Sequence, residues 1–163
     1  MLTFQKACTT DIPILRKLAR EIWTVSYGEM LPARQIEYML NWMYSEETIQ
    51  QEMDKEVLWE LIRLDDENIG FIALTPEAEV LKLNKLYILG NLHGQGFGQA
   101  ALRHVIEYGT SKGFQKIYLT VNKQNAKAMK AYEKAGFIRT DSLVSDIGDG
   151  FVMDDYIYTY PVR

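Results

Sequence analysis

Three glycines at alternate positions form a segment that could hold an anion. Gly94, Gly96 and Gly98 occur in "HGQGFG", which follows an apolar segment and precedes residues with helical periodicity. Glycine allows a tight bend and a close approach of the backbone to a ligand. The first amides of a helix have no partner within the helix and lie at its positive end. The segment therefore predicts a phosphate site, with a tight strand-to-helix turn as the alternative.

Two nucleotide-binding motifs are excluded for this loop. The letters "GFGQAA" satisfy the loose dinucleotide pattern G-x-G-x-x-G/A. A dinucleotide-binding fold, however, has an acidic residue about 20 positions later, at the end of the next strand. Here the predicted strand 116–121 continues as "NKQN", without a carboxylate. A Walker loop is excluded because no Gly-Lys-Ser/Thr follows the glycines.

A second segment carries side chains that could take part in catalysis. The letters "NAKAMKAYEKAGF", residues 125–137, place Asn125, Ala128 and Tyr132 on adjacent turns of one helix. A phenol near a reacting group can donate a hydrogen bond or a proton. The alternative is that Tyr132 is an aromatic residue that packs the helix on a sheet.

Together, the two segments resemble the GCN5-related N-acetyltransferase (GNAT) superfamily. Its pattern is a strand, then Q/R-x-x-G-x-G/A, a helix, a strand, and N-x-x-A-x-x-x-Y-x-x-x-G-F. Residues 93–98 match the first motif except for His93, where the family has Gln or Arg, and residues 125–137 match the second in full. The layout is also similar to bacterial diamine and polyamine acetyltransferases. The resemblance implies an N-acetyltransferase that uses acetyl-CoA as cosubstrate.

The resemblance also implies a role for each motif residue. The strand backbone would bind the pantetheine arm, the loop would hold the pyrophosphate, and the asparagine would contact the cofactor arm. Tyr132 would be the catalytic general acid for the CoA sulfur. The implied cofactor-binding residues are Leu86, Tyr87, Ile88, His93, Gly94, Gln95, Gly96, Phe97, Gly98, Gln99 and Asn125.

The general base is left open by the sequence. Many relatives have a glutamate on the central strand, whereas this chain has Asn84 and Lys85, and neither suits that role. An amine with a pKa near 10 must still lose a proton before it attacks. The candidates by elimination are Glu29, Asp154 and Asp155, which could equally be ordinary surface carboxylates.

The resemblance places the acceptor near residues 23–53 and 138–160. Both segments are rich in aromatic residues and carboxylates, which suit an ammonium-bearing substrate. We expect a primary amine, with a small polyamine-like molecule as the first choice. A protein N-terminus or lysine is one alternative, and a non-catalytic acyl-CoA-binding module is another. The predicted substrate-binding residues are Tyr27, Glu29 and Asp154.

The elements that must position these residues follow from the periodicity. Helices are predicted from Asp11 to Gly28, after Pro32, from Ser45, from Phe97 to Gly109 or Gly113, and over 125–135. Strands are predicted over 2–6, 57–64, 69–74, 80–89, 116–121, 138–147 and 151–160. The fold class is α/β (α+β), with a mixed, mostly antiparallel sheet of 6–7 strands and about 4–5 helices. The resemblance implies split central strands and a single domain, 1–163, with residues 80–137 as its cofactor-binding core.

Composition restricts the partners. The 163 residues are 47% hydrophobic and carry a net charge of −4, which argues against a nucleic-acid partner. The single cysteine, Cys8, belongs to no metal-ligand cluster, so no metal is expected, and we expect it to be a small buried residue. No signal-like N-terminus or 18-residue apolar run is present, which favours a cytoplasmic protein without a membrane partner. A homodimer fits the aromatic surface and the family.

Overall fold

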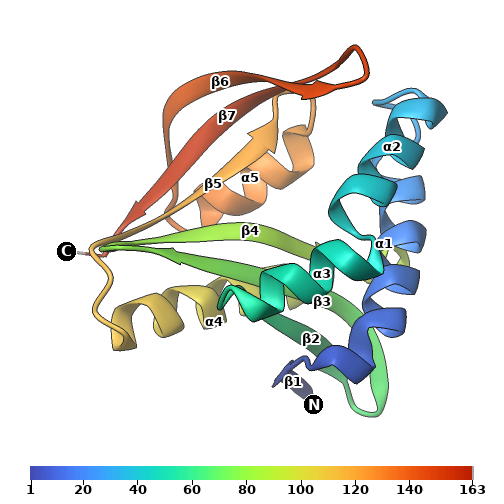
Figure 1. The fold of residues 1–163 in the computed structure, drawn as a ribbon. Coiled ribbons are helices and arrows are strands. Elements are labelled where there is room, and N and C mark those ends of the chain that lie inside the picture. The colour runs from blue at the N-terminus through green and yellow to red at the C-terminus, as the bar shows by residue number, and fades with distance from the viewer. Residues whose placement is uncertain (163) are drawn as a thin grey trace. The chain divides into compact units, whose positions relative to one another are not determined.

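The computed structural model describes residues 1–162, which form five α-helices and seven strands (Figure 1). The predicted number and order of elements are confirmed. The helices are α1 (Ile12–Tyr27), α2 (Ala33–Met43), α3 (Glu46–Asp54), α4 (Phe97–Ser111) and α5 (Ala126–Lys134). The strands are β1 (Leu2–Lys6), β2 (Leu58–Leu64), β3 (Glu67–Glu77), β4 (Val80–Ile88), β5 (Lys116–Asn122), β6 (Ile138–Gly148) and β7 (Phe151–Pro161).

The strands form one mixed sheet in the order β1-β2-β3-β4-β5-β7-β6. β1 with β2, β2 with β3, β5 with β7 and β7 with β6 are antiparallel, and β4 with β5 is parallel. The parallel register comprises only Val80–Lys116, Leu81–Ile117 and Lys82–Tyr118, so β4 continues for six residues beyond it. The predicted mixed, mostly antiparallel sheet is confirmed.

The chain divides into two compact units, each built from two separate segments. The first unit contains Met1–Thr75 and Lys85–Gly98, and the second contains Pro76–Asn84 and residues 99–162. β4 contributes residues 80–84 to the second unit and residues 85–88 to the first. The single domain over residues 1–163 stays a prediction.

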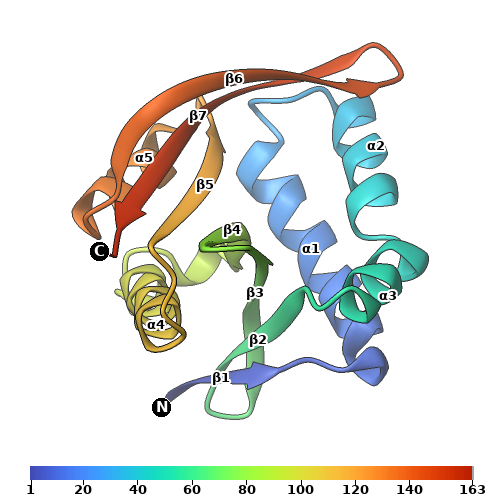
Figure 2. The same ribbon diagram turned by 60° about the vertical axis from the view of Figure 1, so that its left-hand side comes forward.

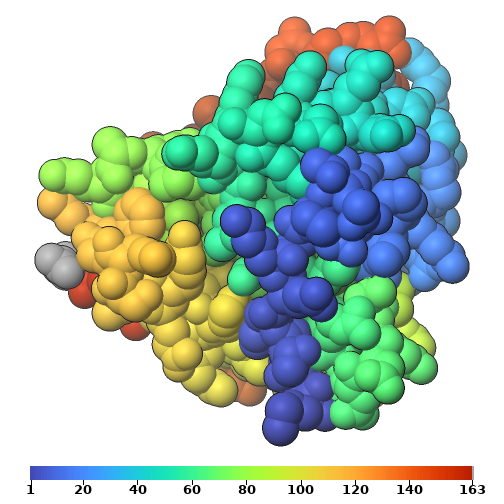
Figure 3. Space-filling model, turned by 60° about the horizontal axis from the view of Figure 1, so that its bottom comes forward, coloured from blue at the N-terminus to red at the C-terminus, as the bar shows by residue number. Residues whose placement is uncertain are grey.

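Local signals in the sequence explain the early helices. Asp11 is the N-cap residue of α1, and Pro13 lies in the first turn, where a missing amide hydrogen costs nothing. The side chain of Ser45 accepts a hydrogen bond from the Thr48 amide at 3.1 Å and caps α3. Figure 3 shows atoms of α1 and α3 in direct contact, and Ile49 of α3 is completely buried.

The prediction that Cys8 is buried is wrong. Cys8 is exposed at the start of the turn Thr9–Asp11, while its neighbour Ala7 is buried. Its backbone amide donates to Asp11 Oδ2 at 2.9 Å, and its Sγ lies 3.0 Å from Thr10 Oγ1. The polar requirements of the turn therefore hold the thiol at the surface.

Aromatic side chains form much of the core of the first unit. The Trp23 indole donates to the Tyr44 hydroxyl at 3.1 Å, and the Tyr44 ring lies 6.2 Å from Trp59 and 5.7 Å from Phe71. These four residues are at most 2% exposed, and burial raises the pKa of Tyr44 well above its ordinary value. Such pairs add about 0.5–1.5 kcal/mol each to the effect of area burial.

A glycine in β3 allows the backbone of β4 to approach closely within the first unit. A Cβ at Gly70 would lie 2.2 Å from the carbonyl oxygen of Tyr87 and 3.1 Å from the Cα of Ile88. We expect Gly70→Ala to lower the free energy of unfolding by at least about 2 kcal/mol, because backbone atoms would have to move. Urea unfolding tests this, with Gly98→Ala as a control that meets no atom within 4 Å. Equal midpoints for Gly70→Ala and the wild type would contradict the close approach.

In the second unit, α4 and α5 lie on one face of β5 and β7. A Cβ at Gly109 of α4 would lie 2.8 Å from Ile117, and the rings of Tyr132 of α5 and Tyr158 are 6.3 Å apart. Ile117 and Tyr160 are opposite each other in the ladder, as are Leu119 and Tyr158, so these residues share the helix-covered face. The intervening pairs, including Asn122 and Asp155, lie on the other face.

β6 and β7 form a long hairpin, as predicted (Figure 2). Gly148 and Gly150 at its turn have φ values of +94° and +78°, which glycine adopts without strain. The hairpin exposes Leu143, Val144 and Val152. The homodimer stays a prediction.

No helix within residues 1–162 combines the length and hydrophobicity that a bilayer crossing requires.

Candidate functional site

The glycine loop in the first unit has the conformation expected of an anion site. Gly94 and Gly96 have φ values of +84° and +85°, in the left-handed region that favours glycine. Phe97 begins α4 directly after them. A Cβ at Gly94, Gly96 or Gly98 would meet no atom within 4 Å, so the space beside this backbone is open. The loop therefore presents helix-start amides next to free space.

His93 connects the loop to the end of β4. Its Nε2 lies 3.0 Å from the carbonyl oxygen of Ile88, so the protonated nitrogen donates to that carbonyl. This contact gives His93 a structural role in place of the Gln or Arg of the family motif. Its contact with a phosphate stays a prediction.

The side chains of Tyr87 on β4 and Tyr27 on α1 lie together, although the sequence predicted cofactor binding for Tyr87 and substrate binding for Tyr27. The hydroxyls of Tyr87 and Tyr27 are 3.3 Å apart, and the Tyr87 ring also lies 6.0 Å from Trp23 and 5.7 Å from Phe71. The sequence motif implied a role only for the backbone of Tyr87, and it carries no signal for this side-chain contact. Leu86 is half-buried, Ile88 is buried, and Glu29 is exposed in the turn after α1.

Lys85 of β4 is buried among aromatic rings. Its side chain is 8% exposed, and its ammonium lies 5.1 Å from the Trp59 ring and 5.5 Å from the Tyr44 ring. Cation–π contacts of this kind stabilise a desolvated charge. Lys85 therefore packs in the core of the first unit, which agrees with the expectation that it does not act as the general base.

The second unit joins α4 and α5 through polar contacts of motif residues. Gln99 donates from Nε2 to the carbonyl oxygen of Ala131 at 2.9 Å. Asn125 caps α5, because its Oδ1 accepts from the Ala128 amide at 3.2 Å. Tyr132 is half-buried, with its ring 6.1 Å from Phe137. The contacts of Asn125 and Tyr132 with a cofactor stay predictions.

Two adjacent carboxylates on β7 have contrasting environments. Asp154 is exposed, and its Oδ1 lies 2.7 Å from the Lys123 ammonium. Asp155 is only 8% exposed, and its buried Oδ1 accepts no hydrogen bond from any described residue. Burial raises the pKa of Asp155 to about 6; the charge of Asp154 also raises it, and that of Lys123 lowers it.

This carboxyl predicts a pH dependence of stability. The pKa of Asp155 is higher in the folded state than its ordinary value of 3.8, so folding favours the protonated carboxyl. The contribution of this group to the free energy of unfolding is therefore complete below pH 4 and is lost as the pH rises through about 6, where the buried carboxyl ionises. We expect a loss of about 2 to 3 kcal/mol over that interval. Urea unfolding of wild type and Asp155→Asn at several pH values measures it, and parallel curves for the two proteins would contradict the buried carboxylate.

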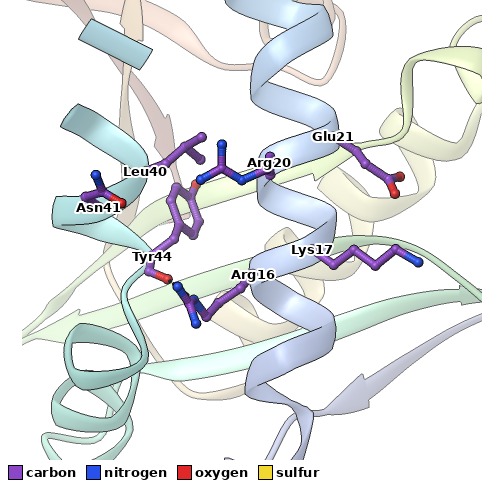
Figure 4. A pocket seen from close by; sticks show the side chains of 7 residues that line it. All are labelled: Arg16, Lys17, Arg20, Glu21, Leu40, Asn41 and Tyr44. Atoms are coloured by element: carbon purple, nitrogen blue, oxygen red, sulfur yellow. Dashed lines mark hydrogen bonds between the residues drawn. The ribbon is translucent and has the colours of Figure 1, made fainter. Parts of the chain in front are cut away.

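A cavity of about 340 Å³ lies between α1 and α2 in the first unit (Figure 4). Arg16 and Arg20 lie on the side toward Tyr44, whereas Lys17 and Glu21 point away from it. Arg16 donates to the Tyr44 carbonyl oxygen at 3.1 Å, and Arg20 makes two hydrogen bonds to Glu37. The cavity contains none of the predicted site residues.

Within residues 1–162 no group of three His, Cys, Asp or Glu side chains could hold a metal ion.

Comparison with known proteins identifies the family. Residues 15–137, three quarters of the chain, match the family model described as the acetyltransferase (GNAT) family. The chain is a member of the GNAT family. This result confirms the resemblance that the glycine loop and the segment 125–137 indicated, and it covers all of the predicted cofactor-binding residues.

Individual relatives agree with this assignment. The peptidyl-lysine N-acetyltransferase YjaB of Salmonella typhimurium is 30% identical over 114 residues, which are 69% of this chain and 72% of that protein. The PaiA N-acetyltransferase of Thermoplasma acidophilum, in complex with coenzyme A, has a TM-score of 0.86, 25% identity and 99% coverage of both chains. The Escherichia coli ribosomal-protein-S18-alanine N-acetyltransferase shares the fold, with a TM-score of 0.76, 20% identity, and coverage of 100% of this chain and 95% of that one. This GNAT protein is an N-acetyltransferase.

Proposed function

We propose that this GNAT protein transfers the acetyl group of acetyl-CoA to a primary amine. The observation that carries the proposal is the glycine loop at the start of α4, whose left-handed Gly94 and Gly96 face open space. The coenzyme A complex of the Thermoplasma relative supports the same ligand for this chain. The loop amides suit a pyrophosphate, and the part of β4 beyond its three-residue register with β5 suits the amides of a pantetheine arm.

Backbone groups of β4 and side chains of α5 would each assist one step of the transfer. The neutral amine attacks the thioester carbon, a nitrogen–carbon bond forms, and the carbon–sulfur bond breaks. An N–H of the β4 backbone, at Tyr87 or Ile88, would stabilise the charge on the carbonyl oxygen. The hydroxyl of Tyr132 would give a proton to the leaving sulfur, because negative charge develops on the sulfur as the bond breaks and a free thiol titrates near pH 8.5. Asn125 would hold the cofactor arm from the start of α5.

Acidic and aromatic residues support a cationic acceptor. Tyr27, Glu29 and Asp154 belong to segments that are rich in aromatic rings and carboxylates, which attract an alkylammonium group. A polyamine-like amine is therefore the first proposed acceptor. The peptidyl-lysine activity in the name of the Salmonella relative favours lysine side chains as a second candidate, and both acceptors present a primary alkyl amine.

Product identification tests this function. The purified chain is incubated with isotopically labelled acetyl-CoA and separate pools of polyamines, amino acids, lysine peptides and peptides with free N-termini. Mass spectrometry should find one labelled acetyl group on a polyamine, or on a lysine if the second candidate holds. Absence of label from every pool, with acetyl-CoA binding demonstrated, would contradict transfer to an amine.

A further inference from the structure

One oxygen of the Asp155 carboxylate, Oδ1, has no hydrogen-bond donor among the described residues. Asp155 is 92% buried, its Oδ1 is shielded from solvent, and that atom accepts no hydrogen bond within residues 1–162. A buried carboxylate oxygen without a donor carries a large desolvation cost. A group of this kind calls for a partner outside the chain, such as a water, an ion, a ligand or a reacting group.

The strands place Asp155 on the face of β7 that the second unit's helices do not cover. Its cross-strand neighbours are Asn122 of β5 and Leu143 of β6, and neither titrates. Lys123 and Asp154 are the charged groups beside it, and they are paired with each other at 2.7 Å. The ammonium of Lys123 therefore forms its ion pair with Asp154.

We propose that Asp155 binds the ammonium group of the acceptor and removes its proton before the amine attacks. This inference rests on the proposed function, and it assigns the base that the sequence left open among Glu29, Asp154 and Asp155. Asp155 is chosen because Glu29 is exposed and Asp154 already has a cationic partner. An alkylammonium ion supplies both the hydrogen-bond donor and the positive charge that the buried oxygen lacks.

The proton balance of the step is complete. The ammonium gives one proton to the carboxylate, and the nitrogen lone pair then forms a bond to the thioester carbon. The carbon–sulfur bond breaks, and the sulfur takes a proton from the Tyr132 hydroxyl. The second amine proton returns to Tyr132 through water, and Asp155 loses its proton to water. The sum is one amide, one free thiol and one released proton.

The environment of the carboxyl suits this exchange. Burial, together with the charge of Asp154, raises the pKa of Asp155 to about 6. The carboxyl is therefore ionised at pH 7. The pKa of an alkylammonium is near 10 in water, and desolvation in the site lowers it toward that of the carboxyl, so the proton can pass to Asp155 as the amine attacks.

Asp155→Asn tests the assignment, with Asp66→Asn as the matched control. Asp66 is an exposed carboxylate in the turn between β2 and β3, outside the segments predicted to hold the acceptor, and its backbone carbonyl accepts a hydrogen bond from Arg63 at 3.0 Å. For Asp155→Asn we expect kcat/KM for spermidine to fall about 20-fold or more. The acidic limb of its pH profile, near pH 6, should disappear, and the Kd for acetyl-CoA should stay within about twofold. Asp66→Asn should behave as wild type.

A second variant covers the case in which Asp155→Asn does not fold. Leu143→Lys places an ammonium directly opposite Asp155 from a position that is 43% exposed, and it should lower kcat/KM by occupying the carboxylate. Wild-type rates and an unchanged acidic limb in Asp155→Asn would overturn the inference. If Asp155→Asn does not fold, wild-type rates in Leu143→Lys would overturn it. If the wild-type protein acetylates no amine at all, the proposed function fails instead, so the two failures are distinguishable.

Discussion

Replacing Tyr132 with phenylalanine should lower kcat about 300-fold while the Kd for acetyl-CoA changes by less than about threefold. The hydroxyl would donate its proton as charge develops on the sulfur, so its contribution arises in the transition state and not in binding. The ring packs 6.1 Å from Phe137 and 6.3 Å from Tyr158, and phenylalanine keeps both contacts. Steady-state kinetics and calorimetric titration with acetyl-CoA measure the two quantities.

Tyr108→Phe is the matched control for this variant. Tyr108 is a half-buried tyrosine on α4, in the same unit, and its ring lies 5.9 Å from the Lys112 ammonium. It should keep wild-type kcat. If Tyr132→Phe also kept wild-type kcat, Tyr132 would be a packing residue, which is the alternative that the sequence left open.

Replacing Gly96 with alanine should raise the Kd for acetyl-CoA about 100-fold. The φ value of +85° strains any residue with a Cβ by about 1 kcal/mol. The methyl group would also occupy the open space in which the pyrophosphate is proposed to approach the loop amides. Loss of two charge-assisted hydrogen bonds, at about 1.5 kcal/mol each, accounts for an effect of this size.

Gly150→Ala separates strain from ligand contact. Gly150 lies at the β6–β7 turn with a φ value of +78° and, like Gly96, has no atom within 4 Å of a Cβ. It should lose a similar amount of stability in urea unfolding but keep the wild-type Kd for acetyl-CoA. A wild-type Kd for Gly96→Ala would show that the glycine serves only the turn.

The fold was predictable because its signals are local. Pro13 and Ser45 mark helix starts, Gly28 follows the end of α1, and the period-2 pattern of β5 gives its buried residues. Strand ends were less accurate, since β3 extends to Glu67–Glu77 beyond the predicted 69–74. Pairing with β2 continues to Glu67, so cross-strand hydrogen bonds extend β3 into the polar turn residues before Ile69.

The candidate site was predictable where motifs specify backbone conformation. The left-handed φ values of Gly94 and Gly96 follow directly from residue type. The sequence could not choose among Glu29, Asp154 and Asp155, because their burial depends on tertiary packing rather than on their neighbours in the chain. The same reason explains why the contact of Tyr27 with Tyr87, 60 residues later, and the contact of His93 with Ile88 were not foreseen.

The central claim is that an amine acceptor receives the acetyl group of acetyl-CoA. The most direct measurement is the initial rate of thiol release from acetyl-CoA with and without spermidine or a lysine peptide, at equal enzyme concentration. We predict release that saturates with the amine, one thiol for each acetylated amine, and a large loss of rate in Tyr132→Phe. Tight acetyl-CoA binding with no amine-dependent thiol release would contradict the claim and would instead favour a non-catalytic acyl-CoA-binding protein.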